Sequence, residues 1–426
     1  MRDVRFGVRV RLGAVAMAVL ALTVAGCGGG DGGDNATQNA KSAPAPKASG
    51  DVTWCIGKDT TGAFSTMVDR FNKQYPNANA KLLELPTSAD EQRTQLIQRL
   101  RAKSSECDVL GIDVIWTAEF AGQNWLLDVS KITDKRQGDF IPSTLKTAEF
   151  DGKTWGVPFN TNAGFLYYRT DKVSSPPSDW QQVYSEAKSK GGIVYQGARY
   201  EGLTVDFLEL LYSAGGRITD DSGKKLDLDK GKATDVLSFM VKGIDDGAAP
   251  KAVTTYMEEE SRRAFESGKP AFMRNWPYTY ALDKKSKIGS TFAVAKFPAW
   301  QGGEPASVVG GYNLAISAYS KNPAGAAAFI DYVTRPEQQL VMGSKAALPP
   351  VLGSVYEDPA LKKALPFAAE LKKAVEQGQA RPVTPVYPQL SEAIYKNVFA
   401  ALQGDMSPKE AVDKMADQAQ SALETF

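Results

Sequence analysis

The most informative absence in this sequence is histidine, which occurs nowhere in its 426 residues. Without histidine a protein cannot build a serine–histidine or cysteine–histidine nucleophile pair, a histidine general base or a histidine-ligated zinc site. A carboxylate pair acting on a glycosidic bond needs no imidazole, so that class of enzyme remains possible. We expect no metal site and no cofactor.

A large excess of charge is missing too. The chain has 50 Lys and Arg against 49 Asp and Glu, and no block of like charge stands out. Neither nucleic acid nor an anionic membrane surface is then an attractive partner on electrostatic grounds. A glycine-rich phosphate loop is also absent, since the glycines at 28–33 lie outside any strand-turn-helix setting. We expect a neutral partner.

No apolar run at the amino end is long enough to cross a membrane. The run at 12–24 has about 13 residues, whereas a span needs about 20. It follows four arginines and precedes Val24-Ala25-Gly26-Cys27, which resembles the lipobox of bacterial lipoproteins. We expect residues 1–26 to be a secretion signal and Cys27 to carry lipid on the extracellular face of the cell membrane. An uncleaved membrane anchor is the alternative.

The next segment, residues 27–50, is rich in glycine, alanine, proline and polar residues. Such a composition cannot bury enough apolar surface to order itself, so we expect a flexible tether that reaches about 25 Å. Its length suits docking to something membrane-bound, and a simple spacer fits equally well. Removing residues 1–26 leaves 46 basic and 48 acidic residues, a net charge near −2.

Cysteine is scarce, with three in the chain. Once Cys27 is assigned to lipid, Cys55 and Cys107 remain, an even number in an exported protein. We favour a disulfide between them. Two buried free thiols on neighbouring strands are the alternative.

Hydrophobic periodicity after the tether predicts an α/β fold. Strands are expected at 52–56, 80–85 and 109–115, with a helix between each pair. The first helix has Phe64, Met67, Val68 and Phe71 on one face, and the second opens on a Ser88–Glu91 capping box. The alternation continues with a strand at 165–168, a helix at 180–188, a strand at 193–195 and a helix at 203–212. This pattern predicts mostly parallel sheets flanked by helices. About 375 residues exceed one comfortable core, so we expect two lobes.

The stretch FMRNWPYTYAL, at 272–282, combines aromatic and hydrogen-bonding side chains. It follows a predicted helix with Glu258–Arg262 and Glu259–Arg263 pairs on its solvated side and then a short strand. Trp276 and its neighbours therefore fall on a loop at the carboxyl end of a strand, where open α/β sheets bind ligands.

Five stretches together resemble family 1 extracellular solute-binding proteins of ABC importers, especially the trehalose- and maltose-binding branch with its actinobacterial lipoproteins. They are GIDVIWTAEF (111–120), VPFNTNAGFLYYR (157–169), AFESGKPAFMRNWPY (264–278), VVGGYNLAIS (308–317) and ARPVTPVYPQLSEAI (380–394). The resemblance implies a periplasmic-binding-protein-like clamp: lobe 1 from 51–158 and 312–350, lobe 2 from 159–311 and 351–426, and a three-strand hinge.

The resemblance also implies a ligand site in the cleft. Trp276 would stack on sugar, Asp113 would accept hydroxyl hydrogens, and Arg381 would approach the ligand. Asn160 and Asn162 stand where some relatives have a tyrosine and an aspartate. The full expected set is Asp113, Glu119, Asn160, Asn162, Glu201, Asn275, Trp276, Tyr278, Gly311, Tyr312 and Arg381.

These residue types suit a sugar, which has an apolar C–H face and a rim of hydroxyls. Several also have an ordinary structural interpretation: Trp276 as core, Asp113 as a helix cap, Arg381 as the partner of a surface carboxylate, Glu201 as a solvated helix start, and Asn160 and Asn162 as bonds to loop backbone.

Two functions therefore compete. In the first, the protein is a monomeric, non-catalytic receptor that closes on a neutral disaccharide, trehalose or else maltose or another α-glucoside, and delivers it to an ABC permease. In the second, it is a secreted carbohydrate-active enzyme with Asp113 and either Glu201 or Glu119 as its carboxylate pair. A ligand-sensing partner of a signalling receptor would share the chemistry of the first.

Overall fold

The computed structural model describes residues 40–425. The expected signal peptide and the lipidation site at Cys27 lie outside these residues. Among the described helices, none combines the length and the apolar character needed to cross a membrane.

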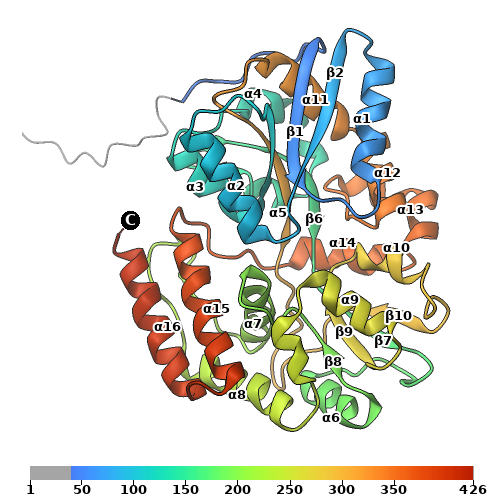
Figure 1. The fold of residues 1–426 in the computed structure, drawn as a ribbon, viewed down its shortest axis with the longest axis vertical. Coiled ribbons are helices and arrows are strands. Elements are labelled where there is room, and N and C mark those ends of the chain that lie inside the picture. Colours follow the sequence, from blue (N-terminus) through green and yellow to red (C-terminus); the bar gives the residue numbers. More distant parts are fainter. Residues whose placement is uncertain (1–39, 426) are drawn as a thin grey trace, which may run out of the picture. The chain divides into compact units, whose positions relative to one another are not determined.

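Residues 40–425 fold into two lobes, each built on a β-sheet with flanking helices (Figure 1). The sheet of lobe 1 has the order β2-β1-β3-β11-β6. Its strands are β1 (Gly50–Gly57), β2 (Ala78–Leu85), β3 (Val109–Asp113), β6 (Val157–Asn162) and β11 (Gly310–Ile316), with a β4 (Glu149–Phe150) and β5 (Lys153–Thr154) hairpin beside them. β1 pairs in parallel with β2 and β3, whereas β11 runs antiparallel to β3 and β6.

The sheet of lobe 2 has the order β10-β7-β9-β8. Its strands are β7 (Phe165–Arg169), β8 (Ile193–Val194), β9 (Phe272–Asn275) and β10 (Phe292–Ala295). β7 is antiparallel to both of its neighbours, and only the β8–β9 pair is parallel. The two-lobed α/β fold is confirmed, but the sheets are mixed rather than mostly parallel.

Helices cover both sheets. Lobe 1 has α1 (Ala63–Gln74), α2 (Ala89–Arg101), α3 (Thr117–Gly122), α4 (Ser130–Thr133), α5 (Pro142–Lys146), α11 (Pro323–Val333), α12 (Pro336–Ala346) and α13 (Pro359–Ala364). Lobe 2 has α6 (Trp180–Lys190), α7 (Glu201–Ser213), α8 (Lys230–Asp245), α9 (Glu258–Glu266), α10 (Thr279–Asp283), α15 (Tyr387–Gln403) and α16 (Pro408–Leu423). Short 3-10 turns are η2 (Val114–Trp116), η3 (Asp134–Asp139), η4 (Lys251–Thr255) and η5 (Gly353–Glu357).

Local sequence explains several helix starts. Ser407 and Glu410 form a capping box at α16, and the Asp179 carboxylate accepts the backbone N–H three residues later at the start of α6. The capping box predicted from Ser88 and Glu91 is wrong in detail: Ser88 is the residue before α2, but its side chain makes no capping bond.

The chain crosses between the lobes three times, and the crossings lie side by side. The first runs from β6 to β7, the second from β10 to β11, and the third follows α14 (Ala368–Gln377). The Val309 N–H donates to the Gln379 carbonyl at 2.9 Å, and the Ser307 hydroxyl donates to the Gly164 carbonyl at 3.1 Å. These bonds join all three crossings into the expected hinge.

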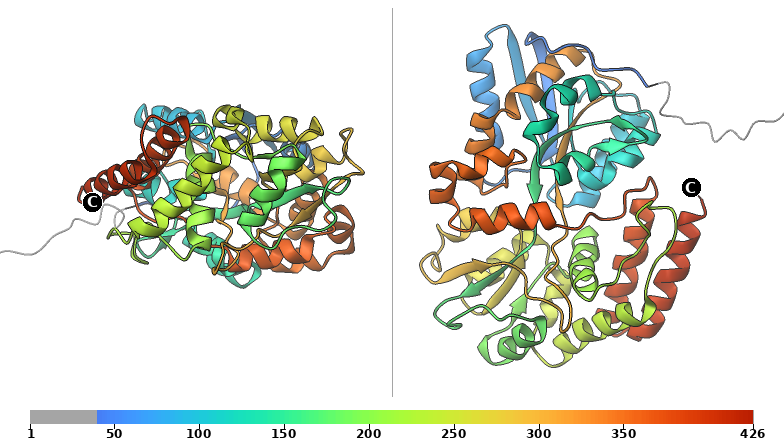
Figure 2. Two further views of the ribbon diagram at one scale, coloured as in Figure 1. Left: turned by 90° about the horizontal axis from the view of Figure 1, so that it is seen from below. Right: turned by 180° about the vertical axis from the view of Figure 1, so that it is seen from behind.

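The contacts of the segment from η5 to α14 differ from its expected place in lobe 2. Residues 351–426 were expected in lobe 2, but η5 and α13 contact α12, and α14 contacts α5, all in lobe 1. α14 lies between the lobes (Figure 2), and Phe367, just before it, packs on the Phe165 and Tyr280 rings of lobe 2. α15 packs on α7 and α8, and α16 packs on α8 and α15.

The carboxyl-terminal part of the expected tether, 27–50, is held on lobe 1. The Ala43 N–H donates to the Asp128 carbonyl at 2.7 Å, the Asp128 N–H donates to Lys41, and the Lys47 N–H donates to Ala324. Ala43 is buried. Composition alone missed this docking because backbone groups make the bonds and any sequence supplies those.

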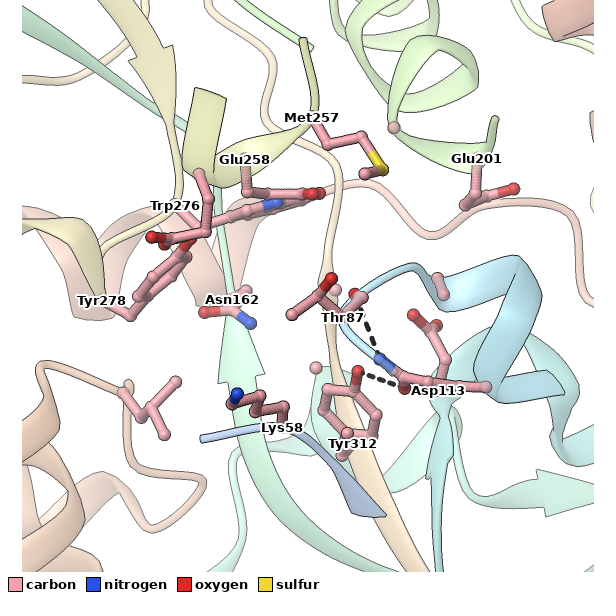
Figure 3. Close-up of a pocket in the computed structure, with 18 of the residues that line it drawn as sticks. Lys58, Thr87, Asp113, Asn162, Glu201, Met257, Glu258, Trp276, Tyr278 and Tyr312 are labelled. Carbon is pink, nitrogen blue, oxygen red and sulfur yellow. Dashed lines mark hydrogen bonds between the residues drawn. The ribbon is translucent and has the colours of Figure 1, made fainter. Parts of the chain in front are cut away.

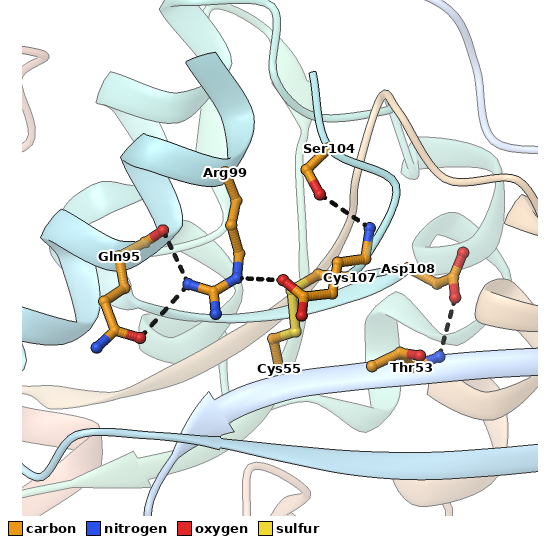
Figure 4. The surroundings of a disulfide bond; sticks show 8 residues. Thr53, Cys55, Gln95, Arg99, Ser104, Cys107 and Asp108 are labelled. Atoms are coloured by element: carbon orange, nitrogen blue, oxygen red, sulfur yellow. Dashed lines mark hydrogen bonds and ion pairs between the residues drawn. A yellow bond between two sulfur atoms is a disulfide. The ribbon is translucent and has the colours of Figure 1, made fainter. Parts of the chain in front are cut away.

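Cys55 lies in β1 and Cys107 just before β3, its parallel neighbour. Their sulfur atoms are bonded in the structure, with a Cα–Cα distance of 5.7 Å (Figure 4). Next to the bond, the Asp108 carboxylate accepts the Thr53 N–H at 2.9 Å. The oxidation of this pair in the cell stays a prediction.

Candidate functional site

A cavity of about 220 Å³ lies between the lobes, and residues from both lobes and from the crossings line it. Lobe 1 contributes Lys58, Asp59, Thr87, Gln92 and Asp113. Lobe 2 contributes Tyr200, Glu201, Met257, Glu258, Glu259, Trp276 and Tyr278. The ends of β6 and β11 next to the crossings contribute Asn160, Asn162, Gly310, Gly311 and Tyr312, and the third crossing contributes Arg381. Figure 3 shows Trp276, Glu258 and Tyr278 together on one side of this space.

Trp276 follows the last residue of β9 and is only partly buried. Its backbone N–H donates to Asn275 Oδ1 at 2.8 Å, and its carbonyl accepts the Tyr167 hydroxyl at 2.9 Å. The Arg274 guanidinium carbon lies 4.1 Å from the centre of the indole. Arg274 itself is buried and does not line the cavity, so it contacts the indole from within the protein.

Tyr278 lies two residues further on, and its hydroxyl donates to Glu259 Oε1 at 2.8 Å. Arg262 holds the same carboxylate through a contact of 2.8 Å and reaches Glu266 at 2.6 Å. Tyr278 is therefore fixed to α9, and its ring is available as a second aromatic surface of the cavity.

Arg381 joins the two lobes. Its guanidinium lies 2.7 Å from Glu201 Oε1 in lobe 2 and 3.0 Å from Asp113 Oδ1 in lobe 1. Glu201 also accepts the hydroxyls of Tyr387 and Ser391. Burial raises the pKa of Glu201 to about 6, an effect that the Arg381 charge opposes, and burial likewise raises the pKa of Asp113.

Two of the alternative interpretations are partly right. Asp113 does accept the Ile115 N–H at 3.2 Å, so it caps the turn η2 while it lines the cavity. Arg381 does pair with carboxylates, but those of the buried cleft rather than the surface. Glu201 is buried, which rules out a solvated helix start.

The asparagines differ from each other. Asn160 Oδ1 accepts the Tyr312 N–H at 3.2 Å, which is the loop-backbone role considered above. Asn162 Oδ1 is buried and has no hydrogen-bond partner among the described residues. Gly311 has a φ of +122°, and a Cβ there would lie 2.2 Å from the Asn160 carbonyl oxygen, so only glycine fits. The Tyr312 hydroxyl donates to Gln92 at 2.9 Å.

Two expected site residues do not line the cavity. Glu119, on α3, is occupied by Arg93, whose Nε donates to it at 2.8 Å. Asn275 is fully buried and donates to the Glu258 carbonyl at 3.1 Å. It lies one residue before Trp276, and its side-chain amide bonds the backbone of Glu258 and of Trp276 and does not line the cavity.

Glu258 was missed by the sequence analysis. It was expected on the solvated face of α9, paired with Arg262, whereas it lines the cavity and Arg262 pairs with Glu259 and Glu266. Burial raises the pKa of Glu258. The sequence did contain an indication of this position. Phe265 is buried and comes seven residues after Glu258, a spacing that places both on the same face of the helix.

Among the described residues, no cluster of acidic or cysteine side chains is placed to hold a metal ion. The arrangement instead provides an aromatic surface, amides, hydroxyls and carboxylates around a cavity with two walls. Such groups recognise a polyhydroxylated molecule by stacking and hydrogen bonding.

Comparison with known proteins gives a consistent result. The sequence pattern of the family described as bacterial extracellular solute-binding protein matches residues 57–340. A probable ABC transporter-binding protein of Deinococcus radiodurans is 38% identical over 373 residues, which cover 82% of this chain and 88% of that protein. The structure of maltose-bound MalE3 from T. maritima is 34% identical, with a TM-score of 0.83 and coverage of 88% of this chain and 100% of that one. The GacH receptor of Streptomyces glaucescens, solved unliganded and with acarbose, shares the fold with a TM-score of 0.82 at 24% identity, covering 89% and 100%.

Proposed function

This chain belongs to the bacterial extracellular solute-binding proteins, and on that premise we propose that it captures a neutral disaccharide for an ABC importer. Trehalose is the first candidate, and maltose or another α-glucoside is the next. The protein is a solute-binding protein and not an enzyme, as its family indicates. The interpretation of Asp113 with Glu201 or Glu119 as a catalytic carboxylate pair is therefore dropped.

One observation carries the proposal: the cavity has an aromatic wall from one lobe and polar groups from both. The Trp276 indole offers a flat surface to the C–H face of a sugar ring. Asn162 Oδ1 is unpaired among the described residues and offers an acceptor to a hydroxyl. A sugar hydroxyl bound there gives this buried oxygen a hydrogen-bond partner that it otherwise lacks.

The hinge allows ligand binding to change the arrangement of the two lobes. Trp276 belongs to lobe 2 and Asp113 to lobe 1, so a sugar that contacts both is bound fully only in the closed form. A ligand shifts such an equilibrium by the difference of its affinities for the two forms. We propose that the permease recognises the closed form.

Support for the class of sugar comes from a relative. The maltose-bound protein of T. maritima is 34% identical across the whole fold, and maltose is an α-linked glucose disaccharide. Trehalose shares that chemistry, and the choice between the two belongs to the experiment.

The test is calorimetric titration of residues 40–426 with trehalose, maltose and sucrose. We expect saturable heat with at least one α-linked glucose disaccharide, and we expect Trp276→Ala to weaken that binding by about 30-fold or more, since a central aromatic contributes at least about 2 kcal/mol. Trp300→Ala is the control, because Trp300 packs on Phe239 and does not line the cavity. Absence of heat with all three sugars, or an unchanged affinity in Trp276→Ala, would refute the proposal.

We also propose that the mature protein begins at Cys27, carries lipid there and acts as a monomer on the outer face of the cell membrane. The motif at residues 24–27 supports this assignment. Cys27→Ser should release the protein into the soluble fraction of cells that otherwise retain it. Retention of the variant on membranes would contradict the lipid anchor.

A further inference from the structure

The buried arginine beside the aromatic wall has no role in the site as described so far. Arg274 is the third residue of β9 and 3% exposed, and its guanidinium carbon lies over the Trp276 indole, 4.1 Å from the ring centre. Burying an arginine is costly unless opposite charges and hydrogen-bond acceptors surround its guanidinium. A residue with so demanding an environment directly behind a ligand-facing ring needs an explanation.

The guanidinium is held on three sides. Its Nε and Nη2 donate to Glu209 at 2.8 and 2.7 Å, forming a two-pronged contact. Its Nη1 donates to Gln196 Oε1 at 2.7 Å, and its Nε lies 2.9 Å from Asp206. These partners leave the planar group a single orientation, because a two-pronged contact fixes both its position and its plane.

The same cluster reaches the hinge. Glu209 lies against Gly164 in the first crossing, where a Cβ would be 2.4 Å from its Oε1. The Val308 N–H, in the second crossing, points to Glu209 Oε1 at 3.5 Å. Glu209 therefore contacts two of the three crossings on one side and Arg274 on the other.

We propose that Arg274 is a positioning residue for the sugar: clamped by Glu209 and Asp206, it fixes the plane of the Trp276 indole relative to the hinge. The inference rests on the proposed saccharide site. Arg274 does not line the cavity; it acts through the indole, whose orientation is fixed by the guanidinium that lies over it. A lysine at the same place keeps the positive charge but lacks the planar guanidinium that fixes the orientation of the indole.

The test compares Arg274→Lys with Arg169→Lys. Arg169 is the matched control, a buried arginine of the neighbouring strand β7 whose carboxylate partner is Asp171 and which makes no contact with the indole. Titration with maltose and with trehalose should show about a tenfold loss of affinity for Arg274→Lys and less than a twofold loss for Arg169→Lys. Thermal midpoints of both variants are measured alongside.

A second readout needs no sugar. The difference between the fluorescence spectra of a protein with and without Trp276→Phe isolates the emission of this indole. The difference is measured in wild type, in Arg274→Lys and in Arg169→Lys. It should change in Arg274→Lys and stay as in wild type in Arg169→Lys. Glu209→Gln keeps the size of the clamp and removes its charge, so it serves if Arg274→Lys fails to fold. We expect a loss of affinity of about threefold for it, between the other two variants.

The outcomes separate the two proposals. Equal losses of affinity in the two lysine variants, or wild-type affinity in folded Arg274→Lys, would overturn the positioning role. An unchanged indole spectrum in Arg274→Lys would do the same. If wild type binds neither sugar while the indole spectrum responds as expected, the proposed function fails and the positioning of Trp276 by Arg274 stands.

Discussion

Asp283 offers a direct test of the electrostatics behind the site loop. It ends α10, is fully buried, and both of its carboxyl oxygens lack a hydrogen-bond partner among the described residues. Burial, reinforced by the Glu266 carboxylate, raises the pKa of Asp283 from 3.8 to about 8, while Arg262 opposes the rise. The folded protein therefore keeps a proton there that the unfolded chain releases.

The direction of the pH effect follows. Below pH 3.8 the carboxyl is protonated in both states and costs nothing. Between pH 3.8 and about 8 only the unfolded chain loses the proton, so the free energy of unfolding falls by about 1.4 kcal/mol per pH unit. Over the whole interval the loss amounts to about 6 kcal/mol, of which about 5 kcal/mol falls above pH 4, and it is complete above the folded pKa.

Asp283→Asn removes this titration while it keeps the shape of the side chain. Urea unfolding of wild type and variant between pH 4 and 9 should show the variant gaining on wild type as pH rises, by about 5 kcal/mol in all. The same substitution at the exposed Asp245 controls for the chemistry of the change. If the gap between wild type and Asp283→Asn stays constant within about 1 kcal/mol from pH 5 to 8, the buried protonated carboxyl does not exist.

Three further predictions concern single contacts. Gly164→Ala should lower the free energy of unfolding by about 1 to 3 kcal/mol, measured by urea, because its Cβ would press on Glu209; an unchanged midpoint would show that the crossing can yield. Cys55→Ser with Cys107→Ser should cost about 4 kcal/mol on the chain-entropy argument, and equal stability of wild type with and without reductant would mean that the bond is not formed. Glu258→Gln should weaken disaccharide binding about tenfold in calorimetry with little change in thermal midpoint, since a charged acceptor is replaced by a neutral one; full affinity would remove Glu258 from the site.

Local patterns in the sequence were sufficient to place the first helices and strands after the tether. Phe64, Met67, Val68 and Phe71 were expected on one face of a helix, and all four are buried on α1. The strand at 109–115 ends earlier, at Asp113, because that carboxylate accepts the Ile115 N–H and turns the chain into η2. A side-chain bond of this kind leaves no trace in hydrophobic periodicity.

Strand direction was harder to predict. β7 follows β6 across the hinge with no helix between them, so the βαβ rule that makes neighbouring strands parallel does not apply to it. Its two neighbours, β9 and β10, come from much later in the chain and run antiparallel to it. Alternation of elements gives their order along the chain but not which strands become neighbours.

The site was predictable where it is local and unpredictable where it depends on distant pairing. The position of Trp276 after a short strand followed from the sequence around it. The bridge of Arg381 to Asp113 joins residues 268 apart, and nothing in either stretch indicates that pairing. Asn275 was misplaced because adjacent residues in extended chain point to opposite sides, and the indole takes the side of the cavity.

The place of β11 in the first sheet has a consequence for biogenesis. It lies between β3 and β6, both made long before it, and pairs with each. Until the chain through Ile316 is present, the edges of β3 and β6 that pair with β11 are unsatisfied, so the first sheet cannot be completed before all four strands of the second sheet have emerged. A nascent or truncated chain that stops short of Gly310 would be prone to self-association and would need protection by a chaperone.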